Sequence, residues 1–180
     1  KNPKLNINRI YCIAIPKRFN YINKILFDYF QFPKSKVTFI KPFLKDKLDR
    51  EELSKKGIIS EYCTLNMGEI ACYLSHIRVL KQFLRSKEDY VIVFEDDLKR
   101  KDKNIVHDKI NNIIQTVPKD FDIIYLGRYY DWCMLNEDIN QYLYRTYYCT
   151  GMHSFIIKRN AAKIILDNIF PINNPIDDYV

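Results

Sequence analysis

Three consecutive carboxylates at the end of a strand-like segment are the residues best suited to chemistry. Residues 90–94 are apolar and rich in β-branched types, which is typical of a strand buried on both faces, and Glu95, Asp96 and Asp97 follow directly. Adjacent negative charges repel one another, so gathering them is costly unless a cation neutralises them. Carboxylate oxygens suit a hard cation such as Mg²⁺ or Mn²⁺. We therefore predict a metal site; the alternative is a polar loop whose acids face water, or in which Asp97 caps a helix.

The elements around this segment predict an α/β fold. Strands and helices alternate in a β-α-β order that is typical of a mostly parallel sheet flanked by helices. In such sheets ligands bind beyond the carboxyl ends of the strands, which is where the three acids would lie. We predict strands at residues 9–15, 37–40, 90–94, 122–127, 144–149 and 154–157, helices at 20–32, 66–85, 105–117 and 159–170, a possible short helix at 49–56, and a loop at 128–143.

The predicted helix at residues 66–85 carries two further polar candidates. Asn66 and Glu69 have the spacing of a capping box. At about 100° per residue, Glu69 and His76 project within about 20° of each other at the edge of the apolar stripe. Either both lie beside the carboxylate cluster, or Glu69 caps the helix while His76 bonds a backbone carbonyl.

Lys17 and Arg18 follow the first predicted strand, after Pro16. Cations at a strand end could bind a diphosphate, and the alternative is that both are ordinary surface residues. The whole chain has 29 basic and 22 acidic residues and a net charge of +7, which favours anionic partners. No basic helix with interleaved aromatics is present, so nucleic acid is not an expected partner.

The length of 180 residues suits one domain, and no apolar run is long enough for a membrane span. Lys1 is not an initiator methionine and the segment ending at Val180 looks unfinished, so we expect residues 1–180 to be a domain of a longer chain. The five cysteines include no Cys-x-x-Cys pair, which argues against a zinc site, and their odd number excludes a complete disulfide framework.

Five segments, in order, resemble glycosyltransferase family 25, which includes lipopolysaccharide and procollagen hydroxylysine galactosyltransferases. They are Gly-Glu-Ile-Ala-Cys-Tyr-Leu-Ser-His at residues 68–76, Val-Phe-Glu-Asp-Asp at 93–97, Asp-Ile-Ile-Tyr-Leu-Gly at 122–127, Phe-Ile-Ile-Lys-Arg-Asn-Ala-Ala-Lys at 155–163 and Pro-Ile-Asp at 175–177. Each segment alone is a weak signal, but five in the correct order are specific.

The resemblance implies a GT-A-like, Rossmann-related fold, a nucleotide-sugar donor, a divalent cation and inversion at the anomeric carbon. Residues 95–97 match the family's DxD-type element. By this match Asp97, with Glu95, would bind Mn²⁺ or Mg²⁺, and Glu95 or Asp96 would hold the ribose or the donor sugar. The nucleotide would be gripped by Lys17 and Arg18, with Glu69 and His76 near the donor pocket.

An inverting transferase also needs a general base for the acceptor hydroxyl. Our hypothesis is Asp177 or Asp178, because this second acid pair lies at a turn that resembles the family's. The expected reaction moves a hexose, galactose or glucose, from a UDP-sugar to a hydroxyl of a glycan or a hydroxylysine-type protein acceptor.

Two alternatives remain at this point. A metal-dependent phosphohydrolase or nucleotidyltransferase also uses strand-end acids, but it would typically need a nucleophilic Asp or a phosphate-cradling glycine loop, and this chain has four glycines. A non-catalytic nucleotide-sugar-binding module that keeps the fold would have no use for three mutually repelling acids.

Overall fold

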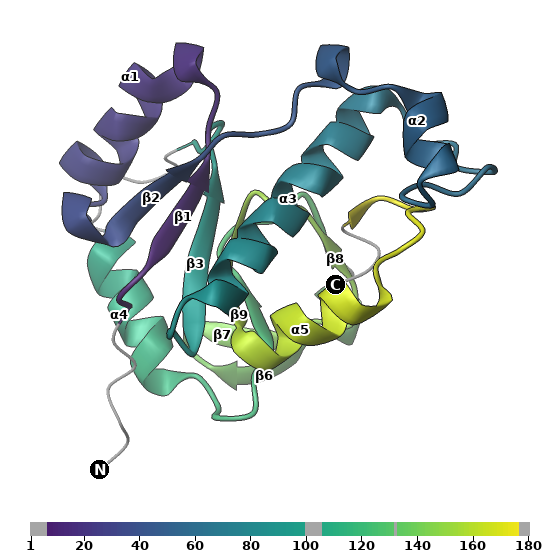
Figure 1. Cartoon of the computed structure of the whole chain (residues 1–180). Helices are drawn as coiled ribbons and strands as arrows, with labels where there is room; N and C mark the ends of the chain where they lie inside the picture. Colours follow the sequence, from purple (N-terminus) through teal and green to yellow (C-terminus); the bar gives the residue numbers. More distant parts are fainter. Residues whose placement is uncertain (1–6, 100–105, 132, 177–180) are drawn as a thin grey trace.

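The computed structural model of the chain describes residues 7–99, 106–131 and 133–176. Its centre is a five-stranded sheet with the order β2-β1-β3-β9-β4 (Figure 1). The strands are β1 (Ile10–Ile13), β2 (Val37–Ile40), β3 (Tyr90–Glu95), β4 (Ile123–Tyr125) and β9 (Ser154–Lys158). β1 pairs in parallel with β2 and β3, whereas β9 runs antiparallel to β3 and β4. The predicted mixed, mostly parallel sheet is confirmed.

The central strands are buried on both faces because helices cover the sheet on both sides (Figure 1). Along β3, Val91 and Val93 belong to one apolar cluster, while Ile92 and Phe94 belong to the other. The first cluster includes α3 (Met67–Arg85) and α5 (Arg159–Asn168); the second includes α1 (Phe19–Asn23) and α4 (Val106–Thr116). Because side chains alternate between the faces of a strand, a continuous apolar run fills both cores.

The predicted helix at 20–32 is present in a modified form. α1 continues into η2 (Lys24–Tyr29), a π-helical segment, and Phe30 N–H donates to the Ile25 carbonyl at 2.9 Å. Gln31 then adopts a left-handed conformation with φ of 56°, which ends the helix before Pro33. Apolar spacing alone predicts the helix but not the wider turn, since Ile25 and Leu26 remain buried in either form.

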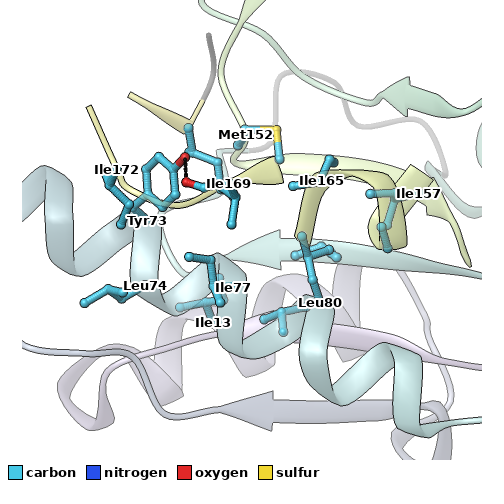
Figure 2. Close-up of a cluster of buried hydrophobic side chains, with 14 of the residues drawn as sticks. Ile13, Tyr73, Leu74, Ile77, Leu80, Met152, Ile157, Ile165, Ile169 and Ile172 are labelled. Atoms are coloured by element: carbon cyan, nitrogen blue, oxygen red, sulfur yellow. Dashed lines mark hydrogen bonds between the residues drawn. The ribbon is translucent and has the colours of Figure 1, made fainter. Parts of the chain in front are cut away.

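Helix α3 begins with the predicted capping box. The Asn66 side chain accepts from the N–H groups of Gly68 and Glu69, and the Glu69 carboxylate accepts from the Asn66 N–H at 2.7 Å. Further along, the inner face of α3 packs against α5 and the segment that follows it (Figure 2). There the Tyr73 hydroxyl donates to the Ile169 carbonyl at 3.5 Å. The long helix is thus fixed at its start by hydrogen bonds and along its length by apolar burial.

Structure also appears where we expected a loop. In the region predicted as a loop and the strand after it, β5 (Tyr130–Asp131) pairs with β8 (Cys149–Thr150), and β6 (Glu137–Asn140) pairs with β7 (Leu143–Arg145). The Asp131 side chain, 4% exposed, organises this region. Its oxygens accept from Asn136, Tyr144 and Thr146 and pair with Arg128 at 2.9 Å. A buried carboxylate needs such donors, and these come from positions with no periodic pattern.

The remaining predicted helix, near residues 49–56, is α2 (Arg50–Lys55), which the Asp49 side chain caps. None of the helices in the described parts of the chain is both long and apolar enough to cross a membrane.

Candidate functional site

The site lies where β1 and β3 end side by side. Ile13 of β1 is paired with Glu95 of β3, so the residues that follow each strand emerge together at one edge of the sheet. Short 3₁₀ helix η1 (Pro16–Arg18) follows β1 and carries Lys17, which is exposed, and Arg18. The basic residues and the acids, which lie 78 residues apart in sequence for Arg18 and Asp96, are therefore neighbours in space.

Asp96 joins the two strand ends. Its Oδ2 accepts from the Ile15 N–H at 2.7 Å, and its Oδ1 pairs with the Arg18 guanidinium at 2.9 Å. The Asp96 side chain is 13% exposed and that of Arg18 is 45% exposed. The carboxylate thus holds the turn after β1 against β3 and sets the position of the Arg18 guanidinium at the edge of the site.

Glu95 turns the other way, toward α3. Its Oε1 lies 2.7 Å from His76 Nε2 and 3.8 Å from Cys72 Sγ. Burial acts to raise the pKa of Glu95, but the hydrogen bond and charge of His76, with smaller contributions from His153 and Cys72, outweigh it and lower the pKa. Glu95 is therefore an ionised carboxylate at neutral pH, with His76 buried beneath it at 1% exposure.

Asp97 is the exposed member of the cluster. The next residue, Leu98, is buried, and its carbonyl accepts a hydrogen bond from the Tyr21 hydroxyl at 2.5 Å. This contact ties the segment after β3 to α1, so Asp97 stands on a backbone that is fixed on both sides. Its carboxylate faces solvent at the edge where Lys17 and Arg18 also lie.

Protein side chains therefore compensate the negative charge of two of the three adjacent acids. Arg18 pairs with Asp96, and His76 hydrogen-bonds Glu95, while Asp97 is exposed. The mutual repulsion that favoured a cation in the sequence is therefore relieved in large part by the fold itself. A cation site here needs support other than repulsion. The geometry supplies some, because the hydrogen bonds that His76 and Cys72 make with the Glu95 carboxylate both use Oε1, and neither uses Oε2.

The other predicted residues fall in different places. Glu69 serves in the capping box of α3, one of the two roles that the sequence left open. It lies two helical turns from His76, about 10 Å along the axis. His76 instead lies beside the acid cluster, where it hydrogen-bonds Glu95, which is one of the two roles that the sequence left open for it. Asp177 and Asp178 lie outside the described residues; Ile176, just before them, is buried in the cluster that contains α3.

The sequence reasoning missed His153. Its carbonyl accepts from the Glu95 N–H at 2.9 Å, and its ring contacts the Tyr129 ring with centroids 5.1 Å apart. Gly127 makes room for this ring, since a Cβ there would collide with His153 Nε2. The sequence did contain a signal for His153. It is one of only three histidines in the chain, it directly precedes a predicted apolar strand, and another predicted strand ends in a glycine, Gly127.

A hollow of about 670 Å³ lies away from these residues, between α1, η2 and β2. Its lining includes Lys24, Asp28 and Phe39, and none of the predicted site residues contributes to it. The strand-end cluster, and not this hollow, is therefore the candidate site.

At this sheet edge an exposed carboxylate and a carboxylate paired with arginine lie beside basic side chains, an arrangement that suits a phosphorylated ligand and a cation. Over an aligned stretch of 70 residues, the chain is 37% identical to procollagen galactosyltransferase 1-A and 34% identical to procollagen galactosyltransferase 1-B of Xenopus laevis. The stretch covers 36% of this chain and 11% of each relative, so the chain spans a small part of these proteins.

The broader match is to a family. The sequence model described as "Glycosyltransferase family 25 (LPS biosynthesis protein)" aligns with residues 17–180, which include Lys17 and Arg18 of η1, the whole of α3 and the strand-end acids. The sheet that carries these residues is consistent with a GT-A-like fold, so the early resemblance is confirmed. The chain belongs to glycosyltransferase family 25.

Proposed function

We propose that this chain transfers a hexose from a UDP-sugar to a hydroxyl group of a glycan or a hydroxylysine-type protein acceptor. The observation that carries the proposal is the family match across residues 17–180, joined to the placement of acids and basic residues at one sheet edge. The similarity to the two procollagen galactosyltransferases supports galactose as the sugar. Glucose, which differs from galactose at one hydroxyl, is the second sugar to test.

The chain's own residues supply a cradle for a nucleoside diphosphate. Arg18 is held by Asp96 with its side chain 45% exposed, and Lys17 is exposed beside it. Both can face phosphate oxygens from the end of β1, at the edge where ligands of α/β sheets bind. Asp96 acts by positioning Arg18, and its remaining exposure leaves room for a contact with the ribose or donor sugar.

Asp97 and Glu95 are the proposed ligands of a divalent cation, Mn²⁺ or Mg²⁺. The exposed Asp97 carboxylate and Glu95 Oε2 offer hard oxygen donors, which fit such an ion. When bound, the cation would neutralise charge on the diphosphate as the nucleotide leaves. His76 keeps Glu95 oriented from below, through the bond to Oε1. The base that accepts the proton of the acceptor hydroxyl is proposed to be Asp177 or Asp178.

The donor site is tested by thermal unfolding in the presence of Mn²⁺ together with one nucleotide at a time. The nucleotides are UDP, UDP-galactose, UDP-glucose and UDP-N-acetylglucosamine. A ligand at about 100 times its Kd stabilises the native state by about 2.7 kcal/mol, which for a chain of this size raises Tm by roughly 5–10 °C. We expect the shift to require both metal and nucleotide and to be lost in Asp97→Ala. The matched control is Asp46→Ala, since Asp46 is also an exposed aspartate and lies in the short helix η4 (Lys45–Lys47).

Turnover is then measured as release of UDP from the donor that gives the largest shift. Asp177→Asn and Asp178→Asn are compared with the unmodified chain, and near-normal rates in both would remove them from the chemistry. A folded sample with no metal-dependent shift for any nucleotide would contradict the donor site, as would an equal shift in Asp97→Ala.

A further inference from the structure

A second group of possible metal ligands lies beneath the strand-end acids. Cys72 and His76 of α3 and Glu95 of β3 each offer one ligand atom, and these atoms all lie within 4.8 Å of one another. The cysteine spacing argues against zinc because the sequence has no Cys-x-x-Cys pair. The fold instead combines one thiol with an imidazole and a carboxylate from two different elements.

The helix sets the first two ligands. Cys72 and His76 are four residues apart, so their side chains lie one above the other on the same face of α3. The helix is rigid at this point, since Tyr73 and Ile77 beside them are buried in the core. β3 then brings Glu95 up to this face, with Oε1 at 2.7 Å from His76 Nε2 and 3.8 Å from Cys72 Sγ.

The spacing suits a small four-coordinate ion. For metal–ligand distances of about 2.0–2.3 Å, ligand atoms at tetrahedral angles stand roughly 3.3–3.7 Å apart. The distance between sulfur and oxygen, 3.8 Å, is slightly longer than this range and must shorten by about 0.1 Å or more. The distance between nitrogen and oxygen, 2.7 Å, must widen by roughly 0.6–1 Å. A rotation of the Glu95 carboxylate can provide this change without movement of the backbone.

The environment leaves one coordination position open. His76 is 1% exposed, the Glu95 side chain is 25% exposed, and Cys72 is exposed. An ion held by these three residues would therefore sit at the protein surface with buried protein on one side and solvent on the other. Three protein ligands and one open position are the pattern of reactive rather than structural zinc sites.

We propose that Cys72, His76 and Glu95 form a binding site for a thiophilic divalent cation of the Zn²⁺ class. Binding replaces the proton of the Cys72 thiol and the proton between His76 Nε2 and Glu95 Oε1 with the metal ion, and both protons pass to solvent. The hydrogen bond between His76 and Glu95 is then replaced by two metal–ligand bonds. Thiolate and imidazole select Zn²⁺ over Mn²⁺ or Mg²⁺, which prefer oxygen. The site shares Glu95 with the cation site of the proposed transferase but does not use Asp97, and it does not depend on that activity.

Co²⁺ is the probe for this site because it replaces Zn²⁺ in tetrahedral sites and reports its ligands by absorption. We expect a thiolate-to-cobalt charge-transfer band and strong visible absorption at one ion per chain, both displaced by Zn²⁺. In Cys72→Ala the thiolate band disappears and Zn²⁺ affinity falls at least about 10- to 100-fold, since even loss of an outer partner of a metal ligand has such effects. Glu95→Gln should also lower the affinity for Zn²⁺, because it removes one of the three ligands.

Two controls separate this proposal from the transferase proposal. Cys63→Ala removes a different thiol and keeps the cobalt spectrum, and Asp97→Asn keeps it while losing the Mn²⁺-dependent response to UDP. Cys72 is exposed, so Cys72→Ala is expected to fold normally, and an unchanged Tm in the absence of metal verifies this. The proposal is overturned by absence of the thiolate band, by an unchanged spectrum in Cys72→Ala, or by equal loss in Asp97→Asn. Failure of the UDP response alone overturns only the transferase proposal.

Discussion

Replacement of Asp96 by Ala and by Asn separates two contributions of this carboxylate. Asp96 accepts a partly buried hydrogen bond from the Ile15 N–H, and its side chain is 13% exposed. It also forms the ion pair with Arg18. Ala leaves that N–H without its acceptor and leaves Arg18 without its partner. Asn keeps an amide oxygen for the N–H and loses only the charge.

The magnitudes follow from the exposure of each contact. A hydrogen bond to a charged group contributes about 1.5–3 kcal/mol, and an ion pair with a half-exposed arginine adds about 0–1 kcal/mol. Asp96→Ala should therefore lower the free energy of unfolding by about 2–3 kcal/mol, or Tm by about 5–10 °C for a chain of this size. Asp96→Asn should cost about 1 kcal/mol or less.

The assay is thermal unfolding without metal or nucleotide, with Asp46→Ala as the control for loss of one exposed carboxylate. A Tm for Asp96→Ala equal to that of the control would refute the assignment of Asp96 as the link between β1 and β3. Equal losses in Ala and Asn would show that the charge, and not the bond to Ile15, is what stabilises this edge.

Further predictions concern the core, the helix cap and pH. Leu80→Ala, at a side chain 1% exposed, should cost about 2–5 kcal/mol in urea unfolding, and a cost under about 1 kcal/mol would contradict its place in the core. Asn66→Ala removes the α3 cap and should cost about 1 kcal/mol, whereas the exposed Thr64→Ala should be neutral. Because the pKa of Glu95 is lowered in the folded protein, its ionised carboxylate stabilises the native state at pH values above its ordinary pKa of 4.5. This stabilisation is lost as the pH falls through the lowered pKa. The difference in Tm between the unmodified chain and Glu95→Gln should therefore be present at pH 7 and disappear in acid; a difference independent of pH would contradict the charged pair.

The central sheet and α3 could be predicted because their signals are local. β3 is a continuous apolar run, and burial on both faces leaves no other pattern for it. α3 combines an apolar stripe with a capping box, so both its start and its buried face are encoded in adjacent residues. The position of the acids followed from these elements, since residues after a strand must emerge at its carboxyl end.

The region from 128 to 150 could not be predicted in the same way. Its centre is the Asp131 carboxylate, whose partners Tyr144 and Thr146 are more than ten residues away. Which donors gather around a buried charge depends on the fold of the loop itself, and no periodicity marks them. His153 was missed for a related reason, because its contact with Glu95 passes through a backbone carbonyl that any residue type carries.

The roles of the three acids also depended on tertiary contacts. The sequence treats Glu95, Asp96 and Asp97 as one cluster whose repulsion needs a cation. In the fold, successive side chains at the strand end point to different neighbours: Glu95 to α3, Asp96 to the end of β1, and Asp97 to solvent. Two acids therefore have protein partners before any ligand binds, and the cluster can fold without metal.

This division of the three acids among different neighbours explains how one short segment can serve two proposed ions. Glu95 faces the soft ligands Cys72 and His76 through one oxygen, while Asp97 offers a hard oxygen on the outer side, where a nucleotide would arrive.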